Sequence, residues 1–150
     1  MQIPSYLRRS LWVAATVMVM ATTAGMAQAQ SRVYSPIALP ASREIDDTLG
    51  SQDIPTGSGG FSRDYTVTLA AGDQVAIDAT SDEFDTLVTL ISKDGATVGE
   101  NDDGSDGSTN SLLFARITES GTYTVRVSAY AGGTNTGKFH LKVARLREIP

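Results

Sequence analysis

The fold of this chain is decided by residues 121–130, GTYTVRVSAY, and by three segments that repeat their pattern. In this stretch Tyr123, Val125 and Val127 alternate with polar residues, as they do in a strand that buries one face. The same alternation occurs next to turn residues at 65–69, 75–79 and 139–143. Short strands separated by turns predict an all-β protein rather than alternating strands and helices.

About eight strand candidates of this kind predict an antiparallel β-sandwich of the jelly-roll or Greek-key type. We place this domain at residues 43–145, with a short tail at 146–150. Residues 30–42 contain two prolines and no sustained period, which indicates an extended N-terminal arm. A chain of this length is expected to build one small domain with one core.

The first 29 residues have the features of a secretory signal peptide. Arg8 and Arg9 precede an apolar run at 11–26, and AQA at 27–29 has the form of a cleavage site. The alternative is a retained anchor, but the run is shorter than the roughly 20 residues that span a bilayer. We therefore expect cleavage after Ala29 and a secreted or periplasmic protein with no stable membrane anchor.

Composition excludes several function classes. The chain has a formal net charge of −5, which disfavours nucleic acid and anionic lipid as partners. It has no cysteine, so disulfides and thiol chemistry are absent. His140 is the only histidine, and because it alternates with apolar neighbours we expect it on a solvent-facing strand surface. The sequence contains no nucleophile elbow, zinc-protease motif or phosphate-binding glycine loop, so we expect no enzyme activity.

An acidic loop, ENDDGSDG at 100–107, is the candidate metal site. Asp102, Asp103 and Asp106 offer the hard oxygen ligands that Ca²⁺ prefers, and Asp85 belongs to a second acidic group that the fold can bring close. The spacing does not fit an EF-hand. The alternative interpretation is a solvated turn whose side chains cap their own backbone.

Two strand candidates, 86–91 and 112–117, are apolar on both faces. If they lie in one sheet, its outer face carries Leu87, Ile91, Leu112 and Phe114. One interpretation is that the N-terminal arm folds back over this patch. A second is a surface for a partner or for self-association, and a third is ordinary tolerance of scattered apolar residues.

Tyr130 is the candidate for stacking against a polysaccharide. It ends a strand, and the only tryptophan, Trp12, lies in the expected signal peptide. The alternative is a tyrosine whose ring packs at the edge of the sandwich while its hydroxyl remains in water.

The order of FDTLV at 84–88, the acidic loop, GTYTVRV at 121–127 and GKFHLKV at 137–143 resembles the bacterial pre-peptidase C-terminal domain. The resemblance covers roughly 44–143 and implies a small sandwich that is appended to secreted peptidases and other exported proteins. Some members of that family, among them the collagen-binding modules of secreted collagenases, resemble calcium binders with ligands before the first strand. The comparable acidic positions here are Glu44, Asp46 and Asp47.

We interpret the chain as an exported, non-catalytic binding or accessory module, with Ca²⁺ as a candidate stabilising ligand. Its partner is expected to be an exported protein or an extracellular polymer. Two alternatives are a partner or chaperone-like domain for a separately encoded secreted hydrolase, and a matrix-binding module for polysaccharide or collagen.

Overall fold

The computed structural model describes residues 34–104, 107–130 and 135–146. The chain divides into two units, Met1–Ser35 and Pro36–Pro150, and every described strand lies in the second. Within the described ranges no helix is long and apolar enough to cross a membrane. The expected signal peptide lies outside these ranges, so its cleavage stays a prediction.

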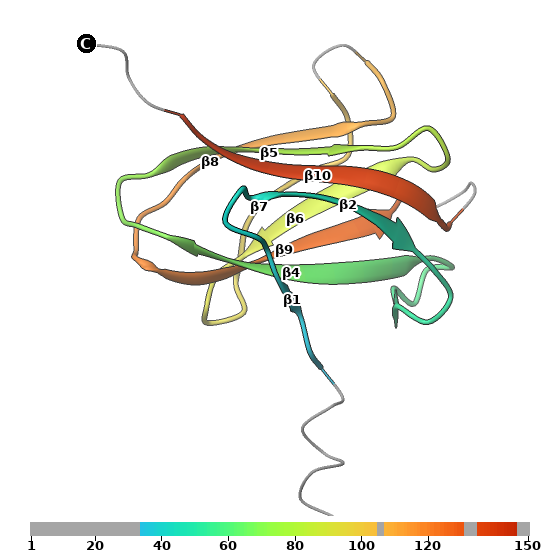
Figure 1. Cartoon of the computed structure of the whole chain (residues 1–150), viewed down its shortest axis with the longest axis horizontal. Helices are drawn as coiled ribbons and strands as arrows, with labels where there is room; N and C mark the ends of the chain where they lie inside the picture. Colours follow the sequence, from blue (N-terminus) through green and yellow to red (C-terminus); the bar gives the residue numbers. More distant parts are fainter. Residues whose placement is uncertain (1–33, 105–106, 131–134, 147–150) are drawn as a thin grey trace, which may run out of the picture. The chain divides into compact units, whose positions relative to one another are not determined.

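The predicted all-β fold is confirmed (Figure 1). The strands are β1 (Ile37–Ala38), β2 (Glu44–Leu49), β3 (Ile54–Pro55), β4 (Phe61–Leu69), β5 (Gln74–Thr80), β6 (Thr86–Ile91), β7 (Thr97–Asn101), β8 (Ser111–Arg116), β9 (Gly121–Ala129) and β10 (Gly137–Leu146). Two of them, β1 and β3, are only two residues long. Strands this short are not visible as a hydrophobic period in the sequence.

The strands form two sheets that enclose one core. The six-stranded sheet has the order β1-β4-β9-β6-β7, and β3 also pairs with β4. The four-stranded sheet has the order β2-β10-β5-β8. The pairings are antiparallel except for the parallel contact of β1 with β4. Figure 1 shows the two layers facing each other, as in a β-sandwich.

The core lies between the inner faces of the sheets, where the alternating residues predicted from the sequence are buried. Val125 and Val127 of β9 face Leu141 and Val143 of β10 from the opposite layer, and all four belong to one hydrophobic cluster. Burial of each such side chain stabilises the fold by about 1.5–3 kcal/mol. This contribution is central in a chain that has no disulfide.

The predicted shared apolar face is wrong. Leu87 and Ile91 lie in β6 of the six-stranded sheet, whereas Leu112 and Phe114 lie in β8 of the four-stranded sheet. The chain changes sheets between β7 and β8, and a hydrophobic period cannot reveal that crossing.

The covering arm is not found in the described part of the arm either. There β1 pairs with β4, at the opposite edge of the six-stranded sheet from β6 and β7. Leu39 packs against the core from this position. The described part of the arm therefore extends a sheet edge and does not cover the outer surfaces of β6 and β8.

A polar network that the sequence did not indicate joins the two sheets. Arg63 of β4 bonds Asp47 of β2 through Nη1 and Oδ1 at 2.6 Å. It also bonds Asp53 with both Nε, at 2.8 Å, and Nη2, at 2.9 Å. The Tyr65 hydroxyl donates to Asp47 Oδ2 at 2.7 Å. Because β2 and β4 belong to different sheets, these bonds hold the two layers together at one end of the sandwich.

The network sets the ionisation of its members. Burial opposes the charge on Asp47, but hydrogen bonds from Tyr65, the Thr48 N–H and Arg63 outweigh it and lower the pKa of Asp47. Burial, followed by the contact with Asp47, raises the pKa of Tyr65. For Arg63, burial is outweighed by the bonds to Asp53 and Asp47, so the pKa of the guanidinium is raised. The Asp47 carboxylate and the Arg63 guanidinium are therefore charged at neutral pH.

Candidate binding surfaces

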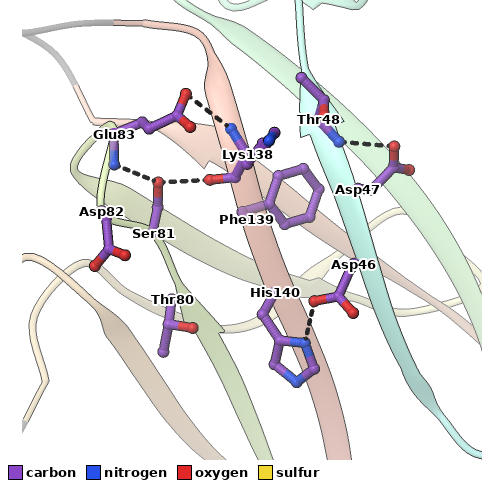
Figure 2. Close-up of a pocket in the computed structure, with 10 residues that line it drawn as sticks. All are labelled: Asp46, Asp47, Thr48, Thr80, Ser81, Asp82, Glu83, Lys138, Phe139 and His140. Carbon is purple, nitrogen blue, oxygen red and sulfur yellow. Dashed lines mark hydrogen bonds and ion pairs between the residues drawn. The ribbon is translucent and has the colours of Figure 1, made fainter.

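An open cleft of about 550 Å³ lies on the four-stranded sheet beside the turn after β5 (Figure 2). Its rim is held by Ser81, whose Oγ donates to the Lys138 carbonyl at 2.7 Å and accepts the Glu83 N–H at 3.0 Å. The Lys138 N–H in turn donates to the Glu83 carboxylate at 3.2 Å. The cleft is acidic overall and is lined by Asp46, Asp47, Thr48, Thr80, Ser81, Asp82, Glu83, Lys138, Phe139 and His140.

His140 lies on the outer face of β10, as predicted. Its Nδ1 is 2.8 Å from an Asp46 oxygen and its Nε2 is 3.2 Å from a Glu44 oxygen. Lys142 also contacts Glu44, at 3.4 Å. The imidazole is thus held between two carboxylates, and no hydrogen bond joins it to Ser81 within the described ranges. Charged side chains on both sides of His140 therefore occupy this part of the cleft.

Two of the carboxylates predicted as calcium ligands act electrostatically on a third. Burial first, and then the charges of Asp103 and Asp102, raise the pKa of Asp85. Oδ1 of Asp85 is buried and has no hydrogen-bond partner among the residues that the structure describes. Asp106 lies outside the described residues.

The described ligands do not complete a metal site by themselves. No group of three or more acidic, histidine or cysteine side chains in the described part of the chain is arranged to hold a metal ion. The acidic residues of β2 are already engaged, because Glu44 and Asp46 contact His140 while Asp47 bonds Arg63. Oxygen ligands for a cation at Asp85 would therefore have to come from the acidic loop and from water.

A second hollow, the outer groove, has a volume of about 410 Å³ and runs over the outer face of the six-stranded sheet. It brings together three of the five residues predicted for a binding surface, Leu87, Ile91 and Tyr130. Tyr130 is 44% exposed. One wall is formed by β3 and the turn that follows it, where the Thr56 N–H donates to the Gly60 carbonyl at 2.9 Å.

Polar groups alternate with the apolar residues of the outer groove. Ser62 and Ser128 share a hydrogen bond of 2.8 Å, and Thr89 donates to the Glu100 carboxylate at 2.9 Å. The groove is also lined by Arg126, which reaches across to Asp64 of β4. Sequence reasoning missed these polar residues because alternation places them on the solvent side, and only strand register shows which of them meet.

Leu112 and Phe114 lie apart from the outer groove, on the other sheet. Phe114 is 63% exposed and borders a shallow hollow of about 320 Å³ with Leu146, Gln74 and Arg116. The five predicted surface residues therefore form two separate surfaces, one on each layer of the sandwich.

Comparisons with known proteins support the fold and the resemblance. Residues 61–129 match the family model of the bacterial pre-peptidase C-terminal domain, which confirms the resemblance inferred from the sequence. The pre-peptidase C-terminal domain of a collagenase from Bacillus anthracis is 14% identical, with a TM-score of 0.57, and the match covers 75% of this chain and 98% of that one.

A second solved structure has a similar fold. It is PliG of Aeromonas hydrophila, a periplasmic inhibitor of g-type lysozyme, at 13% identity and a TM-score of 0.55. The match covers 75% of this chain and 96% of that one. No curated protein matches the sequence. At these identities the two structures establish the sandwich fold alone.

Proposed function

The chain carries a bacterial pre-peptidase C-terminal domain at residues 61–129, and we propose that it is an exported, non-catalytic module that binds an extracellular polymer. The matched family is an accessory domain rather than a catalytic one. The observation that carries the proposal is the outer groove, which combines exposed Tyr130 with the apolar side chains of Leu87 and Ile91. An aromatic ring beside hydroxyl and charged groups suits a ligand with apolar faces and many polar groups, such as a polysaccharide or an extended collagen-like chain.

Replacing Tyr130 by alanine should lower the affinity for such a polymer by about tenfold, because truncating an aromatic anchor costs on the order of 1–2 kcal/mol. The measurement is the bound fraction of purified protein on insoluble glycans and on collagen, over a range of protein concentrations. Val98→Ala is the control, since it removes an exposed apolar side chain that does not line the outer groove. Equal loss in both variants, or no loss in either, would contradict a ligand in the outer groove.

A second candidate function is partnership with a separately encoded exported hydrolase. The acidic cleft of Figure 2 favours it, because Asp82 and Glu83 can meet a basic protein surface. The fold shared with the inhibitor of g-type lysozyme adds support. Assay of g-type lysozyme in the presence of the purified protein separates the two functions, since inhibition that Asp82→Asn weakens points to the cleft and not to the outer groove.

We also propose that a calcium ion binds at Asp85, Asp102 and Asp103. This proposal is supported by the buried Oδ1 of Asp85, which lacks a hydrogen-bond partner within the described residues, and by the charges of Asp102 and Asp103 that act on it. A cation would supply the missing partner and would offset the repulsion. Extracellular calcium sites typically have Kd values near 10⁻⁴–10⁻³ M, and a tenfold excess of ligand over Kd stabilises the folded state by about 1.4 kcal/mol.

Asp85→Asn should have opposite effects with and without calcium. The raised pKa of Asp85 means that its ionised form is disfavoured in the folded state. At neutral pH, without calcium, the variant should therefore melt a few degrees above the native protein, and this gain should fade as pH falls below the ordinary pKa of an aspartate. With millimolar calcium the native protein should gain several degrees and the variant little.

Scanning calorimetry with calcium, magnesium or chelator checks this prediction. Asp94→Asn is the control, because Asp94 is an exposed aspartate in the turn after β6. Equal shifts with both cations, or a native protein that responds to neither, would leave the acidic loop as a solvated turn.

Export is tested separately by the intact mass of protein recovered outside the cytoplasm, which should correspond to a chain that begins at Gln30.

A further inference from the structure

The outer edges of the two sheets differ in how they are protected against pairing with another chain. The free edge of β4 is covered by β1 and β3. Near the C-terminal end of β4, the side chains of Arg43 and Arg145 both donate to the Thr68 carbonyl. The edge strand β2 carries Glu44, Asp46 and Asp47, and β7 has a register shift against β6. Short covering strands, charged residues and bulges are the usual devices that prevent edge-to-edge association.

Beyond Leu112, whose N–H is bonded by Asn101 of β7, the edge strand β8 lacks these devices. Its sequence, SLLFAR, has no proline and no charge before its last residue, and its pairing with β5 continues without a register shift from Ser111 to Arg116. Phe114, at 63% exposure, is the most exposed large hydrophobic residue of the described part of the chain. It projects from the outer face of this edge and borders a shallow hollow with Leu146 and Arg116.

The backbone of β8 shows which groups face outward. The Leu112 N–H donates to Oδ1 of Asn101 in β7, at 3.0 Å, so it points away from β5. In an antiparallel strand the direction of the N–H and C=O groups alternates from residue to residue. The N–H and C=O of Phe114 and Arg116 therefore also point outward, and within the described ranges no hydrogen bond satisfies them.

We propose that two copies of this chain pair through β8 in an antiparallel dimer with Ala115 on the two-fold axis. In this register Phe114 of one copy lies opposite Arg116 of the other. Each of these residues can donate its N–H and accept at its C=O across the edge. The two four-stranded sheets then form one continuous sheet.

The register follows from the groups at the edge. In the alternative register Phe114 of one copy lies opposite Phe114 of the other. Leu112 would then have to pair with Arg116 of the second copy and give up its bond to Asn101. With Ala115 on the axis that bond is kept. The same register places each Phe114 ring beside a guanidinium of the other copy, a contact that favours association through the charge and the stem of Arg116. An edge without acidic side chains is also where two copies of this acidic chain repel each other least.

Sedimentation velocity of the purified exported protein tests the proposal. We expect a concentration-dependent monomer–dimer equilibrium for the native protein. Phe114→Lys should raise the dimer Kd by about tenfold or more, because it faces Arg116 of the other copy with a like charge at two symmetric positions. Its melting curve should match that of a monomeric native sample, since Phe114 is exposed. Thr122→Lys, on the other sheet, is the control and should leave the Kd unchanged.

Cysteine cross-linking tests the register without relying on a loss of function. The chain has no cysteine, so Ala115→Cys introduces one thiol, which should face its own copy across the axis at a distance that suits a disulfide. Arg116→Cys is offset from the axis and should cross-link poorly under the same mild oxidation. A native protein that stays monomeric at high concentration, an unchanged Kd for Phe114→Lys, or equal cross-linking of the two cysteine variants would each overturn the proposal.

Discussion

Replacement of Arg63 by methionine is expected to lower the free energy of unfolding by about 3 kcal/mol at neutral pH. The substitution leaves Asp47 and Asp53 without the guanidinium that neutralises both of them. Breaking a buried ion pair costs about 3–5 kcal/mol, and the partial exposure of this network places the expected loss at the lower end. The bonds also join the two sheets, so the variant should show a lower urea midpoint in a transition that remains cooperative.

The loss of stability in Arg63→Met is expected to depend on pH. The folded state lowers the pKa of Asp47, so the carboxylate contributes stability above its ordinary pKa, and that stability is lost as pH falls through the folded value. The difference between native protein and Arg63→Met should thus be largest near neutral pH and should shrink below about pH 4. Lys142→Met is the control, because its exposed ion pair is worth less than about 1 kcal/mol. A pH-independent loss would show that packing of the Arg63 stem, not charge, is the source.

Arg126→Met is expected to lower the free energy of unfolding by a similar amount, about 3 kcal/mol. The side chain of Asp64 is only 1% exposed, and Arg126 meets it through Nε at 2.7 Å and Nη2 at 2.8 Å. Removal of the guanidinium leaves a buried carboxylate without the cation that compensates its desolvation. Urea denaturation followed by circular dichroism measures the loss.

The double variant Asp64→Asn with Arg126→Met separates charge from packing. If the uncompensated carboxylate causes the loss, the neutral amide should recover part of it, and the double variant should be more stable than Arg126→Met alone. A double variant that is less stable than either single one would contradict this explanation. Because Arg126 also lines the outer groove, polymer binding should be compared only under conditions in which each variant is folded.

The sequence by itself determined which residues of each long strand face the core. Tyr123, Val125 and Val127 alternate with polar residues, and they are buried as that period predicts. The same alternation predicts that His140 lies on the solvent side of its strand, where it is found. Side-chain direction in a strand depends only on local backbone geometry, so one chain segment contains the information. The order of several motifs was also sufficient to reveal the resemblance to the pre-peptidase C-terminal domain, whose family model matches residues 61–129.

Tertiary structure alone decided which strands are neighbours and which polar residues meet. Leu87 and Phe114 have the same local pattern but lie on different sheets, because strand order is set by contacts between distant segments. Arg63 and Asp47 are separated by 16 positions and pair only because β2 and β4 come together from opposite layers. The free edge of β8 is likewise a property of the assembled sheet. A period of two specifies the face of a strand, whereas long-range hydrogen bonding and packing specify its partner.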